Sequence, residues 1–217
     1  MTPRSRGTGR VMQARAQRTR GAGVLAAAEV FDRLGYAATT LDDIAEHMDA
    51  TRGGLQYHFP SKAAIAVAVV EAHHEGWFRL MDEAASWGSG PLDTIGRLIQ
   101  RVGESFATSA IARAGLRLGN EYELIDSELP APFVDWIREI SRLLRRGIAE
   151  GEVSSSVDPD KRARRIVASF FGIQEVSARL DGRAGLAQEL AEWWQDERKL
   201  VASPKVTKKR STANTRR

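Results

Sequence analysis

Apolar residues recur at helical spacing along nearly the whole of this 217-residue chain. Stripes with members three or four positions apart follow one another, and apolar–polar alternation never persists long enough for a half-buried strand. Since a sheet needs such alternation or compact apolar runs, the pattern indicates helix packed on helix. We therefore expect an all-α fold.

Glycine, proline and capping residues divide the chain into helices. Gly35 is placed to end the first helix, Thr40 with Asp43 has the spacing of a capping box, and Thr51 is a good N-cap. Pro130 and Pro132 precede a strongly amphipathic segment. We expect helices over about residues 12–34, 41–48, 52–58, 62–85, 92–106, 111–122, 133–150, 159–180 and 186–200.

The loop-like sequence at residues 87–91 is the natural seam between two domains, although the long helix before it belongs partly to both. We expect a small domain over residues 1–65, a medium domain over 66–203 and a disordered basic tail over 204–217.

Charge is distributed unevenly. The first 20 residues carry six arginines, the last 13 carry six bases, and all 28 acidic residues lie between Glu29 and Glu197. Without those twelve bases the body has 20 basic against 28 acidic residues, a charge of about −8. Basic ends on an acidic body indicate contact with a polyanion through the termini.

Composition excludes several classes of site and location. The absence of cysteine removes disulfides, thiolate zinc sites and cysteine nucleophiles, and four scattered histidines give little basis for a metal site. We expect no cofactor. No apolar run is long enough to cross a membrane and no signal peptide is recognisable, so we expect a cytoplasmic protein.

Residues 41–62, LDDIAEHMDATRGGLQYHFPSK, have the pattern of a helix-turn-helix. Ile44, Met48, Ala50 and Leu55 are apolar where two short helices would pack at a steep angle, and Ala45 is small where they would approach most closely. In this motif the second helix enters the major groove of DNA. The alternative, an ordinary helical hairpin in a core, fits poorly because the segment is polar and rich in glycine.

The chemistry of the second helix favours DNA. Thr51 and Arg52 begin it, Gly53 and Gly54 keep its surface low, and Lys62 begins the next helix, where its charge and free backbone N–H groups predict an anion site. The arginine-rich segment before Gly21 would reach phosphates or the minor groove. The candidate DNA-binding residues are Thr40, Thr51, Arg52, Gly53, Gly54, Gln56, Tyr57, His58 and Lys62.

The segments FDRLGYAATTLDDIA at 31–45 and TRGGLQYHFPSK at 51–62 resemble the signature of the tetracycline-repressor (TetR) family. The resemblance implies an all-α homodimer with a three-helix DNA-binding domain that leaves its operator when a small molecule binds. Two positions depart from the family pattern. Asp49 replaces the usual turn glycine, although aspartate tolerates left-handed backbone, and Gln56 replaces a phosphate-contacting tyrosine.

The second half resembles one branch of that family, the autoregulator receptors of actinomycetes. The segments that carry the likeness are ARAGLRL at 112–118, ELPAPFVDW at 128–136 and FFGIQEVSARLDGRAGLAQEL at 170–190. The resemblance implies a γ-butyrolactone, furan or butenolide ligand and a role in antibiotic production, with Trp136 as the tryptophan that lines the pocket.

An apolar signal needs a hollow with aromatic walls and a few polar groups. Aromatic residues at helical spacing are more often plain core, so only Trp136 is favoured strongly for a pocket. The candidate ligand-binding residues are Trp136, Phe133, His74, Trp77, Leu116, Phe170 and Gln174. The helix that starts at Lys62 would link this hollow to DNA, because Trp77 and His74 lie farther along it.

The last two helices carry more apolar surface than a monomer readily covers, which indicates a four-helix dimer interface. The candidate dimerisation residues are Ile166, Ile173, Leu190, Trp193 and Trp194. A two-fold protein would read a pseudo-palindromic operator.

Other functions remain open from the sequence. The ligand can be an antibiotic or an intermediate, and the regulator can be an activator. An enzyme would need a nucleophile with its base or paired carboxylates, and none of the familiar catalytic motifs is present. A DNA-compacting protein would depend on the basic tails, against which the acidic body argues.

Overall fold

The computed structural model describes residues 6–129 and 133–204, with side chains from residue 12 onward. Over those ranges the chain is helical with no named strand, and one isolated bridge joins Val153 to Ala202. The all-α prediction is therefore confirmed. The helices are α1 (Arg6–Ala38), α2 (Leu41–His47), α3 (Arg52–His58), α4 (Lys62–Ala85), α5 (Pro91–Thr108), α6 (Ala110–Asn120), α7 (Val134–Ala149), α8 (Pro159–Asp181) and α9 (Leu186–Val201).

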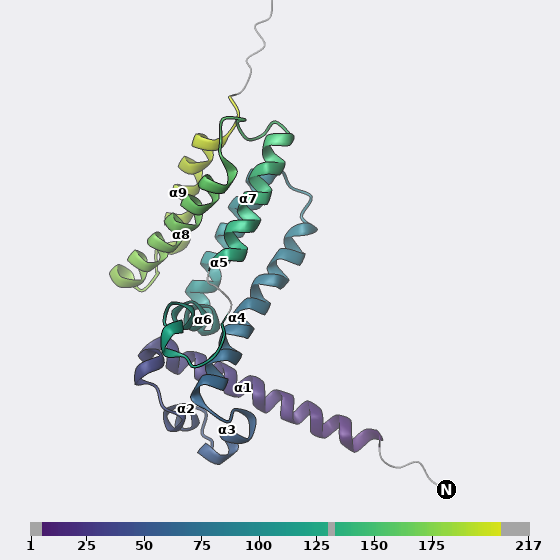
Figure 1. Cartoon of the computed structure of the whole chain (residues 1–217), viewed down its shortest axis with the longest axis vertical. Coiled ribbons are helices and arrows are strands. Elements are labelled where there is room, and N and C mark those ends of the chain that lie inside the picture. The colour runs from purple at the N-terminus through teal and green to yellow at the C-terminus, as the bar shows by residue number, and fades with distance from the viewer. Residues whose placement is uncertain (1–5, 130–132, 205–217) are drawn as a thin grey trace, which may run out of the picture.

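Figure 1 shows α1, α2 and α3 gathered at one end of the molecule, with α4 leaving them toward a bundle of α5, α7, α8 and α9. α6 lies between the two groups. None of the helices described is apolar enough over a sufficient length to span a bilayer.

Side-chain caps fix the ends of the short helices as predicted. Thr40 and Asp43 form a reciprocal capping box at α2, and the Thr51 hydroxyl accepts from the Gly54 N–H at α3. Asp49 takes the left-handed conformation, with φ of 52°, in the turn between them. The two caps fix where α2 and α3 begin, and Asp49 allows the chain to turn between them.

α1 is longer than predicted, since it begins at Arg6 and its N-terminal part projects away from the body (Figure 1). Gly35 ends the regular helix as expected, with φ of 80° and ψ of 173°. The helical spacing of Val24, Leu25, Ala28, Phe31 and Leu34 predicts that all five share the buried face of this helix, which is only partly correct. Leu25 and Leu34 are exposed because the buried face of α1 centres on Ala27 and Phe31 instead.

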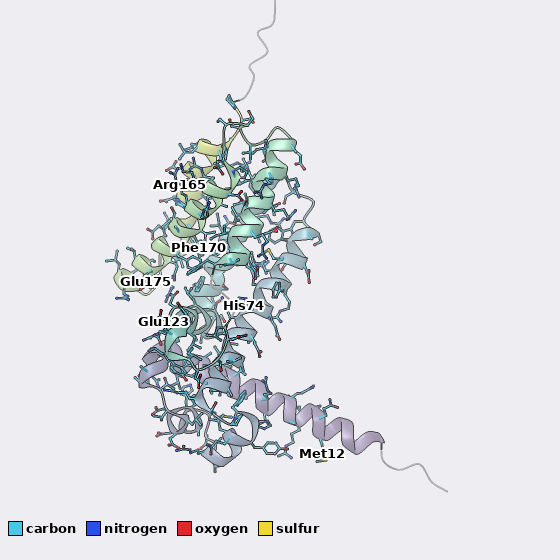
Figure 2. The ribbon with its side chains drawn as sticks, viewed as in Figure 1. Met12, His74, Glu123, Arg165, Phe170 and Glu175 are labelled. Atoms are coloured by element: carbon cyan, nitrogen blue, oxygen red, sulfur yellow. The ribbon has the colours of Figure 1, made fainter. Side chains whose placement is uncertain are left out.

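Two apolar clusters form the interior. The first joins α1, α2, α3 and the start of α4 with Ala114 and Leu118 of α6, and the second joins α5, α7, α8 and α9. The boundary near residue 65 stays a prediction, because α4 belongs to both clusters and α6 packs into the first. The dense arrangement of side chains in both regions is visible in Figure 2.

Two other packing predictions, for Ala50 and Leu200, are wrong. Ala50 is exposed because it lies in the turn and contributes only its backbone N–H, which donates to the Ala45 carbonyl. Leu200 in the last turn of α9 continues the predicted stripe of Leu186, Leu190, Trp193 and Trp194 but is exposed, although the next residue, Val201, is buried. Pro130 and Pro132 lie outside the described residues.

Candidate DNA-binding surface and ligand pocket

α3 presents a polar face to solvent and is held by one apolar anchor. Leu55 is buried, whereas Arg52, Gln56 and Tyr57 are exposed, Tyr57 by 84%. The exposed and half-exposed candidates on this surface are Thr40, Thr51, Arg52, Gly53, Gly54, Gln56, Tyr57 and His58. Because only Leu55 anchors α3 to the domain, the exposed face of the helix can enter a groove of DNA while the domain stays folded.

Arg52 is oriented by a contact from α2. Its Nη1 donates to the Asp42 Oδ2 at 2.7 Å, and both side chains are more than half exposed. The pair adds little to stability at such exposure. Its value is positional, because it holds the guanidinium near the start of α3 with donors still free for a base edge or phosphate.

The paired glycines have no protein neighbour that requires them both. A Cβ at Gly53 would meet nothing within 4 Å, and one at Gly54 would meet only the Thr51 hydroxyl, at 3.2 Å. Each glycine costs a helix about 1 kcal/mol relative to alanine. The packing of this chain does not explain that cost at Gly53, whereas close approach of another molecule would.

Lys62 does not form the predicted anion site with its side chain. Its Nζ donates to the Tyr36 carbonyl at 2.8 Å and lies 4.3 Å from the centre of the Tyr36 ring. The ammonium thus binds the carbonyls at the end of α1, which a helix leaves without partners. Lys62 joins α4 to α1 instead of pointing toward solvent.

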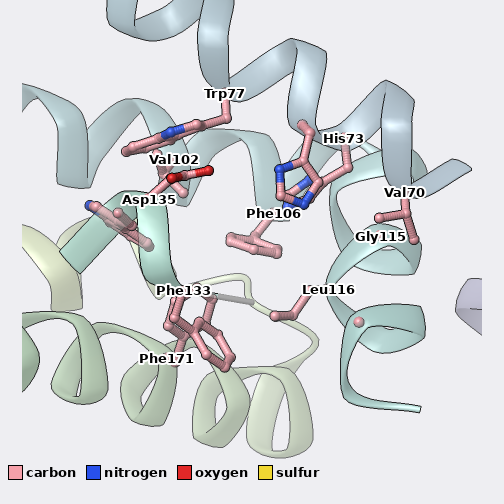
Figure 3. Close-up of a pocket in the computed structure, with 13 residues that line it drawn as sticks. Val70, His73, Trp77, Val102, Phe106, Gly115, Leu116, Phe133, Asp135 and Phe171 are labelled. Carbon is pink, nitrogen blue, oxygen red and sulfur yellow. The ribbon is translucent and has the colours of Figure 1, made fainter. Parts of the chain in front are cut away.

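A hollow lined mainly by aromatic residues lies between α4, α5, α6 and the start of α7 (Figure 3). Five predicted residues line it: Trp136, Phe133, Trp77, His74 and Leu116. Six further lining residues whose side chains the sequence reasoning missed are Val70, His73, Val102, Phe106, Asp135 and Phe171. The structure thus brings most of the predicted pocket together.

Phe170 and Gln174 are not in this hollow. Phe170 is fully buried behind Trp136, with ring centres 4.5 Å apart, and Gln174 lies at a neighbouring cleft. The neighbouring Phe171 takes the pocket position. Helical periodicity shows that both phenylalanines are near the core, but it does not show which of the two lines the hollow.

The indole of Trp136 carries a polar group without a partner. Trp136 is 6% exposed, and its Nε1 is buried with no hydrogen-bond acceptor among the described residues. Trp77 lies tilted beside it and Phe171 meets it edge-on, with ring centres at 5.7 and 5.2 Å. A buried donor without an acceptor costs about 1–3 kcal/mol, so this N–H would gain from a ligand oxygen.

Two polar residues of the hollow, His73 and Asp135, are neutral or already engaged. Burial, and secondarily the charge of His74, lowers the pKa of His73 to about 4, so the imidazole is neutral at pH 7. The carboxylate of Asp135 pairs with Arg138 at 2.8 Å. Such a lining suits an uncharged ligand.

The hollow is small as it stands, with a volume of about 80 Å³, whereas sites for small ligands usually measure about 300–1,000 Å³. A second void of about 330 Å³ lies on the other flank of α4 and shares His73, Trp77 and Val102 with the hollow. α4 packs extensively on α6 and α1 but lightly on α5. There is space for α4 to move when the hollow widens.

α6 touches the hollow with one face and α1 with another. Leu116 lines the hollow, while Arg113 Nε binds the Asp32 carboxylate at 2.7 Å and Arg117 Nη1 donates to the Asp32 carbonyl at 2.8 Å. Glu121 Oε2 completes this set of contacts by accepting from the Tyr36 N–H at 2.7 Å. α6 therefore connects the hollow to the DNA-binding end directly, a link that the sequence reasoning assigned to α4 alone.

Three of the predicted dimerisation residues are unavailable. Ile166, Leu190 and Trp194 are buried within the protomer, where α8 and α9 pack on α5 and α7. Ile173 and Trp193 are partly exposed. The outward apolar residues of α8 are Val176, 52% exposed, and Leu180, 81% exposed. The apolar residues predicted to form the dimer interface therefore belong largely to the protomer's own core.

Comparisons with known proteins agree with this geometry. The profile of bacterial regulatory proteins of the tetR family matches residues 24–69, and a tetracyclin repressor-like C-terminal domain matches residues 90–201. The A-factor receptor protein of Streptomyces griseus is 38% identical over 194 residues, which are 89% of this chain and 67% of that protein.

Two solved structures are similar along most of the chain. A γ-butyrolactone receptor described as ArpA-like has a TM-score of 0.69 and 29% identity, covering 85% of this chain and 99% of that one. CprB of Streptomyces coelicolor, in complex with its operator sequence, has a TM-score of 0.76 and 31% identity, covering 84% and 87%.

Proposed function

Because the chain belongs to the TetR family of bacterial regulatory proteins, we propose that it is a dimeric transcriptional repressor which a γ-butyrolactone-like signal releases from a pseudo-palindromic operator. In this proposal it acts in the cytoplasm and controls antibiotic biosynthesis. The observation that carries the proposal is the pairing of an exposed, glycine-bearing α3 with an aromatic hollow that contains an unpartnered indole N–H.

The proposed operator contact is made by α3 and the residue that caps α2. Arg52, with donors left free by Asp42, is suited to a guanine edge, and Gly53 would allow the backbone to approach the duplex. Tyr57 and Thr40 are placed to bind phosphate. CprB, a similar structure, is described in complex with its operator sequence, which supports DNA as the partner.

The proposed effector is neutral, compact and amphipathic. A lactone carbonyl would accept from Trp136 Nε1, and an alkyl chain would lie against Phe106, Phe133 and Phe171. An acceptor supplied by the ligand would relieve a buried donor that this protein leaves unsatisfied. The names of the similar proteins, A-factor receptor and γ-butyrolactone receptor, point to the same class.

We place the dimer contact on the outward face of α8, around Val176 and Leu180, with Ile173 and Trp193 at its border. A two-fold arrangement through this face would present two copies of α3 to one side of the molecule. Half-site spacing in the operator then follows from the distance between the two helices.

Release would follow from widening the hollow. A ligand larger than about 80 Å³ must displace α4 or α6, and the void behind His73 and Trp77 gives α4 a direction in which to move. α4 begins beside α3. Lys62 joins α4 to the end of α1, and Arg117 joins α6 to it. Displacement therefore reorients the DNA-binding end.

The energy required is within reach of such a ligand. Shifting a two-state equilibrium from 1:99 to 99:1 needs a preference of roughly 10⁴-fold, about 5.5 kcal/mol. Two bound ligands per dimer would each supply half of it, the equivalent of burying roughly 110 Å² of apolar surface at about 25 cal/mol per Å².

Trp136→Phe tests the assignment because it removes the N–H and keeps an aromatic ring. We expect operator affinity to stay within twofold and the γ-butyrolactone concentration for half-release to rise about tenfold, measured by gel shift. A panel of butyrolactones, furans and butenolides identifies the ligand class. If the variant responds to every compound as the wild type does, Trp136 is not the ligand's hydrogen-bond donor.

A further inference from the structure

A second cleft lies between the end of α1, the outer face of α6 and the C-terminal half of α8. It measures about 800 Å³, ten times the aromatic hollow, and shares Leu116, Phe133 and Phe171 with it as a common wall. The opposite side of the cleft carries arginines. One side is thus apolar and the other cationic.

Three arginines of this cleft are matched by carboxylates. Arg113 binds Asp32 at 2.7 Å, Arg117 binds Glu121 at 3.0 Å, and Arg179 binds Glu175 at 2.7 Å. These pairs account for every acidic residue that lines the cleft.

Arg183 is the cation left over. Among the described residues it has no carboxylate within ion-pair distance, and its Nε and Nη2 both donate to the Gln174 amide oxygen at 3.3 Å. Gln174 is 2% exposed, so the guanidinium is held against a buried neutral acceptor. Two long hydrogen bonds to one neutral oxygen satisfy a guanidinium poorly, since it has five donors in a planar fork.

The position of Arg183 is set by its backbone. Its φ of 71° follows Gly182, and its N–H donates to the Asp181 carboxylate at 3.0 Å. Burial, and next the neighbouring charge of Arg113, lower the pKa of Arg183 more than the carboxylates of Asp32 and Glu175 raise it. Both causes disfavour the cation in the cleft as it stands, and a bound anion would offset them.

We propose that this cleft binds the carboxylate of a small amphipathic acid, with its oxygens on Arg183 and Arg113 and its apolar part against Phe133 and Phe171. Carboxylate is the anion whose planar shape matches a guanidinium fork with two parallel hydrogen bonds. The apolar wall requires a hydrocarbon portion, which inorganic anions lack. This site is separate from the hollow that holds the neutral effector.

A bound acid would change the position of the DNA-binding end through Arg113. Its guanidinium holds Asp32 of α1, so a carboxylate that attracts Arg113 competes with that contact and loosens α6 from α1. The acid would then lower operator affinity without entering the hollow. This coupling, unlike the binding itself, rests on the proposed function.

The binding test uses the full-length protein and isothermal titration calorimetry. Hexanoate and octanoate are titrated, and the affinity of each is compared with that of its methyl ester. The variants are Arg183→Gln and the matched control Arg179→Gln, whose arginine already has Glu175. We expect the acids to bind and the esters to bind at least about tenfold more weakly. Arg183→Gln should lose at least tenfold in acid affinity, and Arg179→Gln less than threefold.

The remaining outcomes overturn the proposal. Equal binding of acid and ester, no binding of either acid, or equal losses in the two variants would each show that the cleft does not select a carboxylate through Arg183. Dissociation of the Arg183→Gln dimer, seen by analytical ultracentrifugation, would show that the cleft receives the second protomer instead. A normal response of both variants to γ-butyrolactone keeps this result distinct from failure of the proposed function.

Discussion

Gly115→Ala perturbs the contact between α4 and α6 at the edge of the hollow. A Cβ at Gly115 would lie 2.6 Å from His73 Cγ, whereas carbon atoms settle at about 3.5–4.0 Å, so the two helices must separate by roughly 1 Å. Overpacking of this kind costs about 1–3 kcal/mol, and alanine returns about 1 kcal/mol through its helix propensity. We expect a net loss of up to about 2 kcal/mol in the free energy of unfolding.

The same separation should imitate the ligand. If 1–2 kcal/mol of the strain is relieved in the released state, operator affinity falls about 5- to 30-fold without effector. Fluorescence anisotropy of a labelled operator measures the affinity, and urea unfolding measures the stability. Gly76→Ala on the same α4 is the control, since its Cβ would meet only the Arg79 guanidinium, at 3.9 Å. Full operator affinity in a destabilised Gly115→Ala protein would refute the link between helix spacing and DNA binding.

Three further predictions concern stability and assembly. The pKa of His73 is about 4 in the folded protein and 6.5 in the unfolded chain, so only the unfolded chain gains this proton as pH falls from about 6.5 to 4. The wild type should therefore lose about 2 kcal/mol more unfolding free energy than His73→Gln between pH 7 and pH 5, measured by urea titration. The same pH profile for both proteins would contradict this. Val176→Asp should produce monomers in sedimentation velocity and Val134→Asp on α7 should not, whereas a dimeric Val176→Asp would move the interface elsewhere. Lys62→Met should lower unfolding free energy by roughly 1 kcal/mol yet leave the salt dependence of operator binding unchanged, and a slope shallower by about one unit would restore Lys62 as a phosphate ligand.

Local structure followed from the sequence where one or two neighbouring residues decide it. The Thr40–Asp43 capping box, the Thr51 cap and the left-handed Asp49 depend on side chains within three positions, and all three were predicted. The spacing of apolar residues likewise predicted where the helices lie. Their exact faces did not follow, as the exposed Leu25 shows, because periodicity gives the existence of a buried face and not its centre.

Contacts between distant segments were beyond such reasoning. Arg113 and Arg117 bind Asp32 from 81 and 85 positions away, so no local pattern marks α6 as the link to α1. For the same reason Phe170 was predicted to line the hollow, whereas Phe171 lines it. Trp136 was identified only through a family resemblance, and its unpartnered N–H is a property of the folded surroundings.

One titration tests the central claim that α3 holds DNA under control of the hollow. Labelled operator saturated with the wild-type protein is titrated with γ-butyrolactone, while anisotropy reports bound DNA. The chain has five tryptophans, so the difference in indole fluorescence between the wild type and Trp136→Phe, titrated alike, reports the hollow. We predict that both signals change over the same ligand range and that anisotropy falls to the value of free operator. A fluorescence change that leaves the operator bound would contradict the account.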